Sequence, residues 1–402
     1  MSRRRTDWGT AADYASIRGE VAIAGVGESD HSNASGRSSN EIAAQAIERA
    51  LDDAGLRPDE IDGFMSSPGV GDQFDEAAYH AHFGTSQPMW VSPEGGAMVW
   101  AATAPYPAAE GLRTGKARHI LNIFSVAWAT QRSQMEGGPG KFHAEERFKA
   151  NLELPFGWFP QPVYFATIAR RHMFEFGTTA EQLGAIAVSA RRHANRNPAA
   201  VMRDKPLSLS DYLARPMLVD PLRVEDCCLI SDGGAACIMT TPERARDLRK
   251  PLVLVEGVGM GMADTGQYWS QQKAFTSTPQ VFSAPAAFAM AGIEPDDVDV
   301  LTLYDPFTIV TLMQIEDMGF CEKGEGGAFM ADSGLDFDGG GLPTNPHGGM
   351  LSHAYVLGSA HVVEIVRQLR GESASQVAGA EVAVYGGYTG HLASTLVLRR
   401  AA

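Results

Sequence analysis

The cysteines and histidines are the side chains most able to perform covalent or acid–base chemistry in this chain of 402 residues. The cysteines are Cys227, Cys228, Cys237 and Cys321, so no position before 227 can supply a thiolate nucleophile. Their spacing matches no zinc framework, and four thiols in a long chain do not indicate a disulfide scaffold. The sequence therefore predicts a reduced protein without a cysteine nucleophile in its N-terminal half.

Four histidines fall close together near the C-terminus, at His347, His353, His361 and His391. No two of them have the spacing of the HExxH metalloprotease motif, and no cysteine stands among them, so we expect no metal site. We interpret His353 and His361 as histidines of a helix surface or of the core.

Two glycine pairs stand beside these histidines. Gly348-Gly349 follows His347, and Gly386-Gly387 precedes His391 by a few residues. Glycine lacks a Cβ, so its backbone can approach a ligand closely and its N–H group can donate to that ligand. Turns that need glycine explain the same pairs nearly as well. A third glycine-rich run, 25–27 (GVG), begins no dinucleotide-binding fingerprint, so a Rossmann site is disfavoured.

The elements that must position these residues occur twice along the chain. Residues 20–27 (EVAIAGVG) and 252–259 (LVLVEGVG) are short apolar runs closed by glycines, as expected for buried strands. An Ala-rich stretch with helical periodicity follows each run, at 41–54 and 285–291. Both helices then end alike, with a glycine that stops the helix and a proline that forbids its resumption. We infer a duplicated α/β unit.

The duplication predicts two halves, 18–250 and 251–402. Within the first half, about 116–220 reads as an inserted region of loops and helices. It holds a Gly/Pro-rich loop at 136–140 and an amphipathic helix near 180–195. A further helix-like run at 242–249 precedes the boundary.

The composition excludes several classes of protein. Hydrophobic residues make up 44% and charged residues 20%, which is usual for a globular protein. A formal net charge of −15 speaks against nucleic acid or an anionic membrane surface as a partner. The chain shows neither a secretory signal nor a run of about 18 apolar residues, so we expect a cytoplasmic protein with no membrane span.

Four motifs in a fixed order resemble those of the thiolase superfamily. They are 221–236 (PLRVEDCCLISDGGAA), 304–308 (YDPFT), 345–349 (NPHGG) and 386–391 (GGYTGH). The chain is most similar to sterol-carrier-protein-type thiolases and their lipid-transfer-protein-like relatives, from about residue 18 onward. This resemblance implies an α/β thiolase fold of two duplicated mixed-sheet halves in αβαβα layers, and a homodimer.

The departures from the thiolase pattern concern the catalytic groups. Thiolases acylate a cysteine at a helix N-terminus in the first half, and the corresponding stretch here, 94–115, contains none. The second thiolase cysteine is absent too, since none follows Cys321. Cys227 and Cys228 fall on a structural motif of the family, and we interpret them as buried small hydrophobes. Claisen chemistry through an acyl-enzyme is therefore not expected.

The resemblance places a tyrosine at each of the two positions that form the thiolase oxyanion hole. Tyr304 stands where the family has the first residue of its HDCF or NEAF turn, and Tyr355 where it has the histidine of its Gly-His-Pro turn. A buried tyrosine is usually a packing residue, but two of them at these positions favour a catalytic pair. Asp305 either orients Tyr304 or caps the turn. The motifs also imply pocket positions for His347, His391, Gly348, Gly349, Gly386 and Gly387.

Two phenols suit a retro-aldol cleavage, which needs a base for a β-hydroxyl group, a stabiliser for the thioester enolate and an acid for Cα. We assign Tyr304 as the base toward the hydroxyl group and Tyr355 as the donor to the enolate. A basic tyrosine requires a pKa shifted downward from about 10. Steroid side-chain aldolases are thiolase relatives of this kind, and the resemblance implies that a 17-hydroxy steroid side-chain CoA thioester yields a 17-ketosteroid and propionyl-CoA.

The same resemblance implies a partner and no cofactor of the chain's own. The partner is a DUF35 protein or domain, a zinc ribbon plus OB-fold that is often fused to a hydratase. CoA is part of the substrate, and zinc is expected only in the partner. Two alternatives stay open, an acyl-CoA acyltransferase with an atypical nucleophile and a non-catalytic thiolase-like scaffold or lipid carrier.

Overall fold

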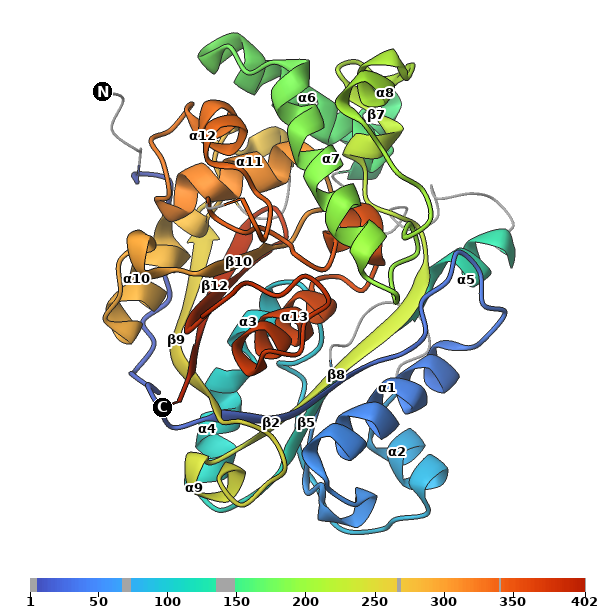
Figure 1. The fold of residues 1–402 in the computed structure, drawn as a ribbon, viewed down its shortest axis with the longest axis vertical. Helices are drawn as coiled ribbons and strands as arrows, with labels where there is room; N and C mark the ends of the chain where they lie inside the picture. The colour runs from blue at the N-terminus through green and yellow to red at the C-terminus, as the bar shows by residue number, and fades with distance from the viewer. Residues whose placement is uncertain (1–5, 67–73, 135–148, 266–268, 340, 402) are drawn as a thin grey trace.

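A mixed sheet of ten strands forms the centre of the protein (Figure 1). The computed structural model describes residues 6–66, 74–134, 149–265, 269–339 and 341–401, and the loop predicted at 136–140 lies outside them. The strand order is β10-β11-β12-β9-β2-β8-β5-β3-β4, and β1 pairs with β9. The strands are β1 (Gly9–Ala11), β2 (Ala22–Glu28), β3 (Gly63–Ser66), β4 (Trp90–Ser92), β5 (Ile120–Ala127), β8 (Asp232–Thr240), β9 (Val253–Ala263), β10 (Val300–Leu303), β11 (Val382–Tyr388) and β12 (Leu392–Arg400).

The two parts of this sheet have the same topology. The first part has the order β3-β5-β8-β2, and the second has β10-β11-β12-β9. In each, the first pair is parallel and the other two pairs are antiparallel. They join where Ala22 and Ile23 pair with Leu254 and Val253. The predicted duplication is thus visible as a repeated strand order, while the boundary near residue 250 stays a prediction.

Helices cover and separate the two parts, which gives the expected αβαβα layers (Figure 1). Helix α1 (Ser39–Ala54) packs on β2, β8 and β5, and α10 (Gln280–Ala291) packs on β9 and β12. Between them, α3 (Val99–Thr103) packs on β11 and β12 of the second part, while α13 (Ser359–Arg370) also packs on β8 and β2 of the first. The two halves therefore share one core.

The glycines repeated in β2 and β9 let a helix lie directly on each strand. A Cβ at Gly25 or Gly27 would overlap the backbone of α1, and one at Gly257 or Gly259 would overlap the backbone of α10. This close approach explains the GVG pattern without a ligand. Both helices end at a left-handed glycine, Gly55 for α1 and Gly292 for α10, as the sequence predicts.

Three predicted helices have different bounds. Helix α10 begins at Gln280 rather than 285, with Pro285 inside it. The run at 242–249 is helical only in α9 (Pro242–Ala245). The stretch 94–115 forms two helices, α3 and α4 (Pro105–Arg113), because Pro105 cannot donate the backbone bond that would continue α3.

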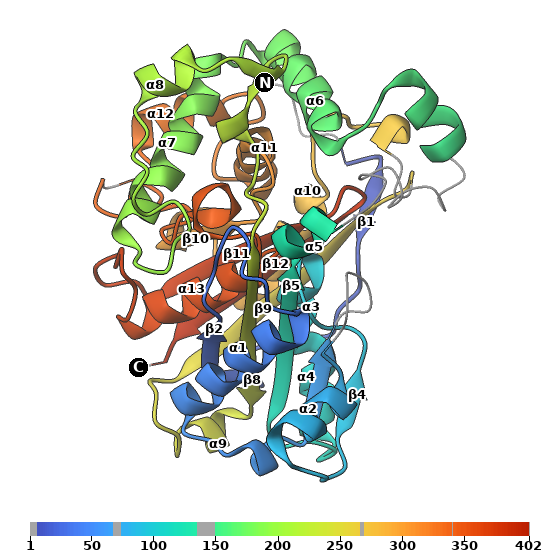
Figure 2. The same cartoon turned by 90° about the vertical axis from the view of Figure 1, so that its right-hand side faces the viewer.

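A cap of helices lies over one end of the sheets (Figure 2). The inserted region supplies α6 (Gln161–Phe176), α7 (Ala180–Arg196) and α8 (Leu209–Ala214), and the second half supplies α11 (Thr308–Met318) and α12 (Gly326–Ser333). No described helix has both the length and the apolar character that crossing a membrane requires. The remaining elements include α2 (Glu76–Phe83), α5 (Trp128–Gln134), β6 (Met217–Val219) and β7 (Leu222–Arg223).

Candidate active site

Tyr304 lies directly after β10, at the end of the sheet that faces the cap. It is 8% exposed. Its N–H group donates to the carbonyl of Gly386 at 2.8 Å, and its own carbonyl accepts a bond from the side chain of Gln314 at 2.8 Å. The backbone of Tyr304 is thus held between β11 and α11.

Tyr355 follows a single helical turn, η8 (Gly349–His353), and is half-buried. Its N–H group donates to Oγ of Ser231 at 2.7 Å, and its ring stacks on Trp128 with the centroids 6.4 Å apart. A charge on Tyr355 contributes, after burial, to the raised pKa of Tyr304. The action of the two phenols as a catalytic pair stays a prediction.

Both phenols are held in the protonated form. Burial raises the pKa of Tyr304 well above its ordinary value, and the neighbouring Tyr355, Cys228, Tyr385 and Asp305 raise it further. Burial, followed by Cys228, raises the pKa of Tyr355. A downward shift, which a phenolate base would require, is the opposite of what the site provides. As hydrogen-bond and proton donors, however, neutral phenols are suited to a developing oxyanion.

Asp305 caps the turn that leads to Tyr355. Its carboxylate accepts the N–H groups of Met350 at 2.8 Å and Leu351 at 3.3 Å, and it lies 2.9 Å from Nε2 of His361. Of the two roles open for Asp305, these contacts support turn capping. The side chain is fully buried, so it depends on these donors to replace water.

Three buried histidines, His347, His353 and His361, pack ring against ring in a row. The ring of His347 packs edge-on against His361, at 4.5 Å between centroids, and against His353, at 5.2 Å. Burial, with smaller contributions from His361 and His353, places the pKa of His347 well below its ordinary value, so the ring is neutral. Neither of its nitrogens has a hydrogen-bond partner among the described residues. His353 and His361 are core residues of this row, not surface residues.

His391 lies apart from this row, in the turn between β11 and β12. Its carbonyl accepts the N–H group of Ala263 at 2.8 Å. Burial lowers the pKa of its ring, and the backbone of Thr389 partly offsets that shift. No interaction joins its ring to either phenol within the described part of the chain, so a contact with substrate stays a prediction.

The two glycine pairs have different structural roles. Gly349 has a φ of +61°, and a Cβ there would overlap the carboxylate of Asp305. Gly348 has a φ of +109° and lies against Ala194 of α7. Gly386 and Gly387 are not in a loop, as their motif suggested, but in β11, paired with β12. Their missing side chains leave room for neighbouring side chains and, at Gly387, for the backbone of α3.

A third tyrosine, which the sequence did not single out, completes the site. Tyr385 of β11 is fully buried, and its hydroxyl donates to the carbonyl of Met98 at 3.0 Å. Met98 precedes α3 with a φ of 55°, and its N–H group donates to Leu357, which has a φ of 46°. Such strained backbone gathers at functional sites. The only sequence signal for Tyr385 was its position directly before the Gly386-Gly387 pair.

The two adjacent cysteines belong to the wall of the site. The N–H group of Cys228 donates to the carbonyl of Pro306 at 2.8 Å, which ties it to the turn after Tyr304. Burial is the main reason that the pKa of Cys227 rises to about 12 and that of Cys228 higher still. Neither thiol is therefore activated as a nucleophile.

Comparison with known proteins finds relatives along nearly the whole chain. Residues 261–400 match the family model described as thiolase C-terminal domain-like. The chain is 34% identical to the steroid side-chain-cleaving aldolase of Thermomonospora curvata, over 90% of this chain and 93% of that protein. It is 35% identical to the 17-hydroxy-3-oxo-4-pregnene-20-carboxyl-CoA lyase of Mycobacterium tuberculosis, over 95% of this chain and all of that protein. A solved structure, the Ltp2-ChsH2(DUF35) aldolase, superposes with a TM-score of 0.86 at 33% identity and covers 96% of this chain and 99% of its own.

Proposed function

This chain belongs to the steroid side-chain-cleaving aldolases of the thiolase superfamily, and we propose that it cleaves a 17-hydroxy steroid side-chain CoA thioester by a retro-aldol reaction. The observation that carries this proposal is the similarity to an aldolase and a lyase over nearly the whole chain, in a protein without a cysteine before Cys227. The two phenols, Tyr304 and Tyr355, are the groups that we propose for the chemistry.

The proposed reaction breaks the bond between Cα and Cβ of a β-hydroxyacyl thioester. The β-hydroxyl group loses its proton and becomes a ketone, and the electrons of the broken bond form the thioester enolate. Cα then gains one proton, so the overall reaction moves a proton from oxygen to carbon without any oxidant. For a 17-hydroxy steroid with a three-carbon acyl side chain, the products are a 17-ketosteroid and propionyl-CoA.

The two phenols can carry that proton without either becoming a stable phenolate. Tyr304 accepts the hydroxyl proton while its own proton moves toward Tyr355, and Tyr355 protonates Cα. Each phenol is neutral before and after the reaction, which agrees with the upward direction of both pKa shifts. Asp305 holds Tyr304 and Tyr355 in their relative positions, because it follows Tyr304 and caps the turn that leads to Tyr355. We place His347, Gly348 and Gly349 along the wall of the substrate pocket.

We further propose the assembly of this protein. A DUF35 partner is supported by the composition of the Ltp2-ChsH2(DUF35) aldolase, which resembles this chain over nearly its full length. The partner would supply the zinc, and this chain would need no cofactor, since CoA arrives as part of the substrate. A cytoplasmic homodimer is the arrangement that the thiolase resemblance favours.

The experiment is a turnover assay with 17-hydroxy-3-oxo-4-pregnene-20-carboxyl-CoA, using the purified protein alone and with a DUF35 protein. We expect equal amounts of the 17-ketosteroid and propionyl-CoA by mass spectrometry. The matched control substrate lacks the 17-hydroxyl group and cannot undergo the reaction. Binding without turnover in either preparation would indicate a scaffold or lipid carrier, and transfer of the acyl group to a second thiol would indicate an acyltransferase.

A further inference from the structure

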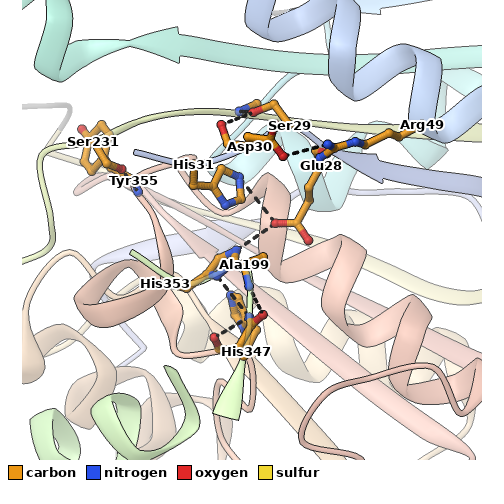
Figure 3. A network of polar contacts seen from close by, with 12 residues as sticks. Glu28, Ser29, Asp30, His31, Arg49, Ala199, Ser231, His347, His353 and Tyr355 are labelled. Carbon is orange, nitrogen blue, oxygen red and sulfur yellow. Dashed lines mark hydrogen bonds and ion pairs between the residues drawn. The ribbon is translucent and has the colours of Figure 1, made fainter. Parts of the chain in front are cut away.

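A buried carboxylate of the first half, Glu28, is bound to the segment that carries Tyr355 (Figure 3). Glu28 ends β2 and is 6% exposed. One oxygen, Oε2, lies 2.8 Å from Nε2 of His353, and the other pairs with Arg367 of α13. Burial alone would raise the pKa of Glu28, but Arg367 and His353 hold it well below its ordinary value. The carboxylate is therefore ionised at neutral pH.

The side chain of Asn197 determines which nitrogen of His353 carries the proton. Its Oδ1 accepts the N–H group of Ala199 at 3.0 Å, and its Nδ2 donates to the carbonyl of His347 at 3.0 Å. Both bonds would be lost if the amide were turned over. Because Nδ2 is also 3.2 Å from Nδ1 of His353, that ring nitrogen accepts, and Nε2 carries the proton that it donates to Glu28.

Glu28, His31 and His353 also resemble a set of metal ligands, since one donor atom from each lies within 4.8 Å of the others. The proton on Nε2 of His353 occupies the side of the ring that a metal ion would need. The guanidinium of Arg367 already neutralises Glu28 from its other oxygen. Because Glu28 is already paired with Arg367, it cannot also balance the charge of a divalent ion, so the contacts favour a hydrogen-bonded pair over a metal site.

From these contacts we propose that Glu28 is a positioning residue for Tyr355, acting through His353; this inference rests on the proposed catalytic role of Tyr355. Tyr355 lies two residues after His353. Asp305 of the second half fixes the start of the turn 349–353, and Glu28 of the first half fixes its end. Loss of Glu28 would leave a ring N–H and a guanidinium without their acceptor, and the turn would move to find new ones.

Other side chains of the first half also contact this turn or Tyr355. Nε of Arg191 donates to Oγ of Ser352 at 2.9 Å, Nδ2 of Asn197 lies 3.2 Å from Nδ1 of His353, and Oγ of Ser231 accepts the N–H group of Tyr355 at 2.7 Å. The carbonyl of His353 accepts the N–H group of Val201 at 2.9 Å, and that of Met350 accepts the N–H group of Leu229 at 2.9 Å. These contacts hold the backbone of the turn, and Glu28 adds an ionised acceptor for Nε2 of His353. A displacement of about 1 Å in a catalytic group can cost roughly 10²-fold in rate. A shift of His353 after loss of the bond to Glu28 would therefore be passed on to Tyr355, two residues further along the chain.

The test measures kcat and KM for the 17-hydroxy acyl-CoA in six variants, one of them the double variant of Glu28 and Tyr355. Glu28→Gln replaces one of the two acceptor oxygens by an NH₂ group, so His353 and Arg367 cannot both keep their acceptor. This variant should lower kcat by about 10²-fold and leave KM within about threefold. His353→Leu should do the same, whereas His353→Gln should recover much of the rate because its amide can still donate to Glu28. Tyr355→Phe supplies the reference, and Glu28→Gln should reduce the rate no further in that background. Glu48→Gln is the matched control, since Glu48 lines the same 870 Å³ cavity as Glu28 but is exposed.

Each result has one interpretation. An unchanged kcat in folded Glu28→Gln overturns the inference, and so does a loss that multiplies with that of Tyr355→Phe, because Glu28 would then act elsewhere. If Glu28→Gln does not fold, the comparison of His353→Gln with His353→Leu decides, and equal rates for those two overturn the inference. Normal turnover by Tyr355→Phe would refute the proposed catalytic pair itself, and Glu28 would then have no catalytic residue to position. That outcome differs from an unchanged kcat in Glu28→Gln alone, so the two failures can be told apart.

Discussion

The N–H group of Met350 donates to the carboxylate of Asp305 at 2.8 Å, and this bond links the two turns that carry the phenols. Asp305 is the residue after Tyr304, and Met350 lies in the turn that ends two residues before Tyr355. One carboxylate therefore couples the positions of two side chains that are 51 residues apart in sequence (355 minus 304).

Removing either phenolic hydroxyl should stop turnover while preserving the fold. Tyr304→Phe and Tyr355→Phe keep the buried rings, so packing is retained, but the proton path is lost. We expect kcat to fall by about 10²- to 10⁴-fold, as for loss of a general acid or base. The release of propionyl-CoA measures the effect, and near-normal rates in both variants would refute the catalytic pair. Tyr14→Phe, whose ring stacks on Tyr106, should retain full activity.

Gly349→Ala should lower the free energy of unfolding by more than the cost of placing an alanine at a positive φ. A side chain at φ +61° costs about 1–2 kcal/mol, and here the new Cβ would also overlap Asp305. We expect a larger loss in the free energy of unfolding, together with loss of turnover. Gly379→Ala is the matched control, because Gly379 has a φ of +74° but open space around it. Denaturant titrations measure the free energy of unfolding of both variants. Equal losses in the two would show that the structure relieves the overlap with Asp305 at no cost in stability.

The buried lysine Lys323 should matter for stability. Its side chain is 7% exposed and lies 2.9 Å from Glu316 and 3.2 Å from Asp317, and Glu316 also contacts His172. Lys323→Met leaves two buried carboxylates without their cation, so the free energy of unfolding should fall by about 3–5 kcal/mol. The exposed pair Lys273–Asp264 gives the comparison, and Lys273→Met should change stability by less than about 1 kcal/mol. Chemical denaturation measures the free energy of unfolding of both variants and so compares the buried lysine with the exposed one.

His31 should make the protein sensitive to mild acid. Burial lowers the pKa of His31 to about 4, against about 6.5 in the unfolded chain. Between these values the unfolded chain binds a proton that the folded protein does not, so stability falls as the pH decreases through this window. The loss attributable to His31 approaches about 3 kcal/mol near pH 4.

The corresponding variant is His31→Leu, with the free energy of unfolding measured from pH 8 to pH 4. At pH 8 His31 is neutral in both states, so the difference between the two proteins reports packing alone. In acid the variant should lose less stability than the unsubstituted protein. Parallel curves over the whole range would mean that His31 does not contribute to acid sensitivity.

The local elements could be predicted from the sequence because their signals are local. The apolar runs at 20–27 and 252–259 become β2 and β9, and the helices after them end at Gly55 and Gly292 as expected. Helix starts were less certain, because packing of α10 on β9 extends the helix five residues before the predicted start. The sequence also determined that no cysteine precedes Cys227, which removes thiolase chemistry whatever the fold.

Only the tertiary structure decided how the candidate residues act on one another. It brought Tyr385 to Met98, placed Gly386 and Gly387 inside a strand, and joined Glu28 to His353 across 325 residues. It also reversed the expected direction of the pKa shift at Tyr304. The physical reason is that burial and Coulomb interactions depend on neighbours in space. Around these two phenols, those neighbours come from both halves of the chain.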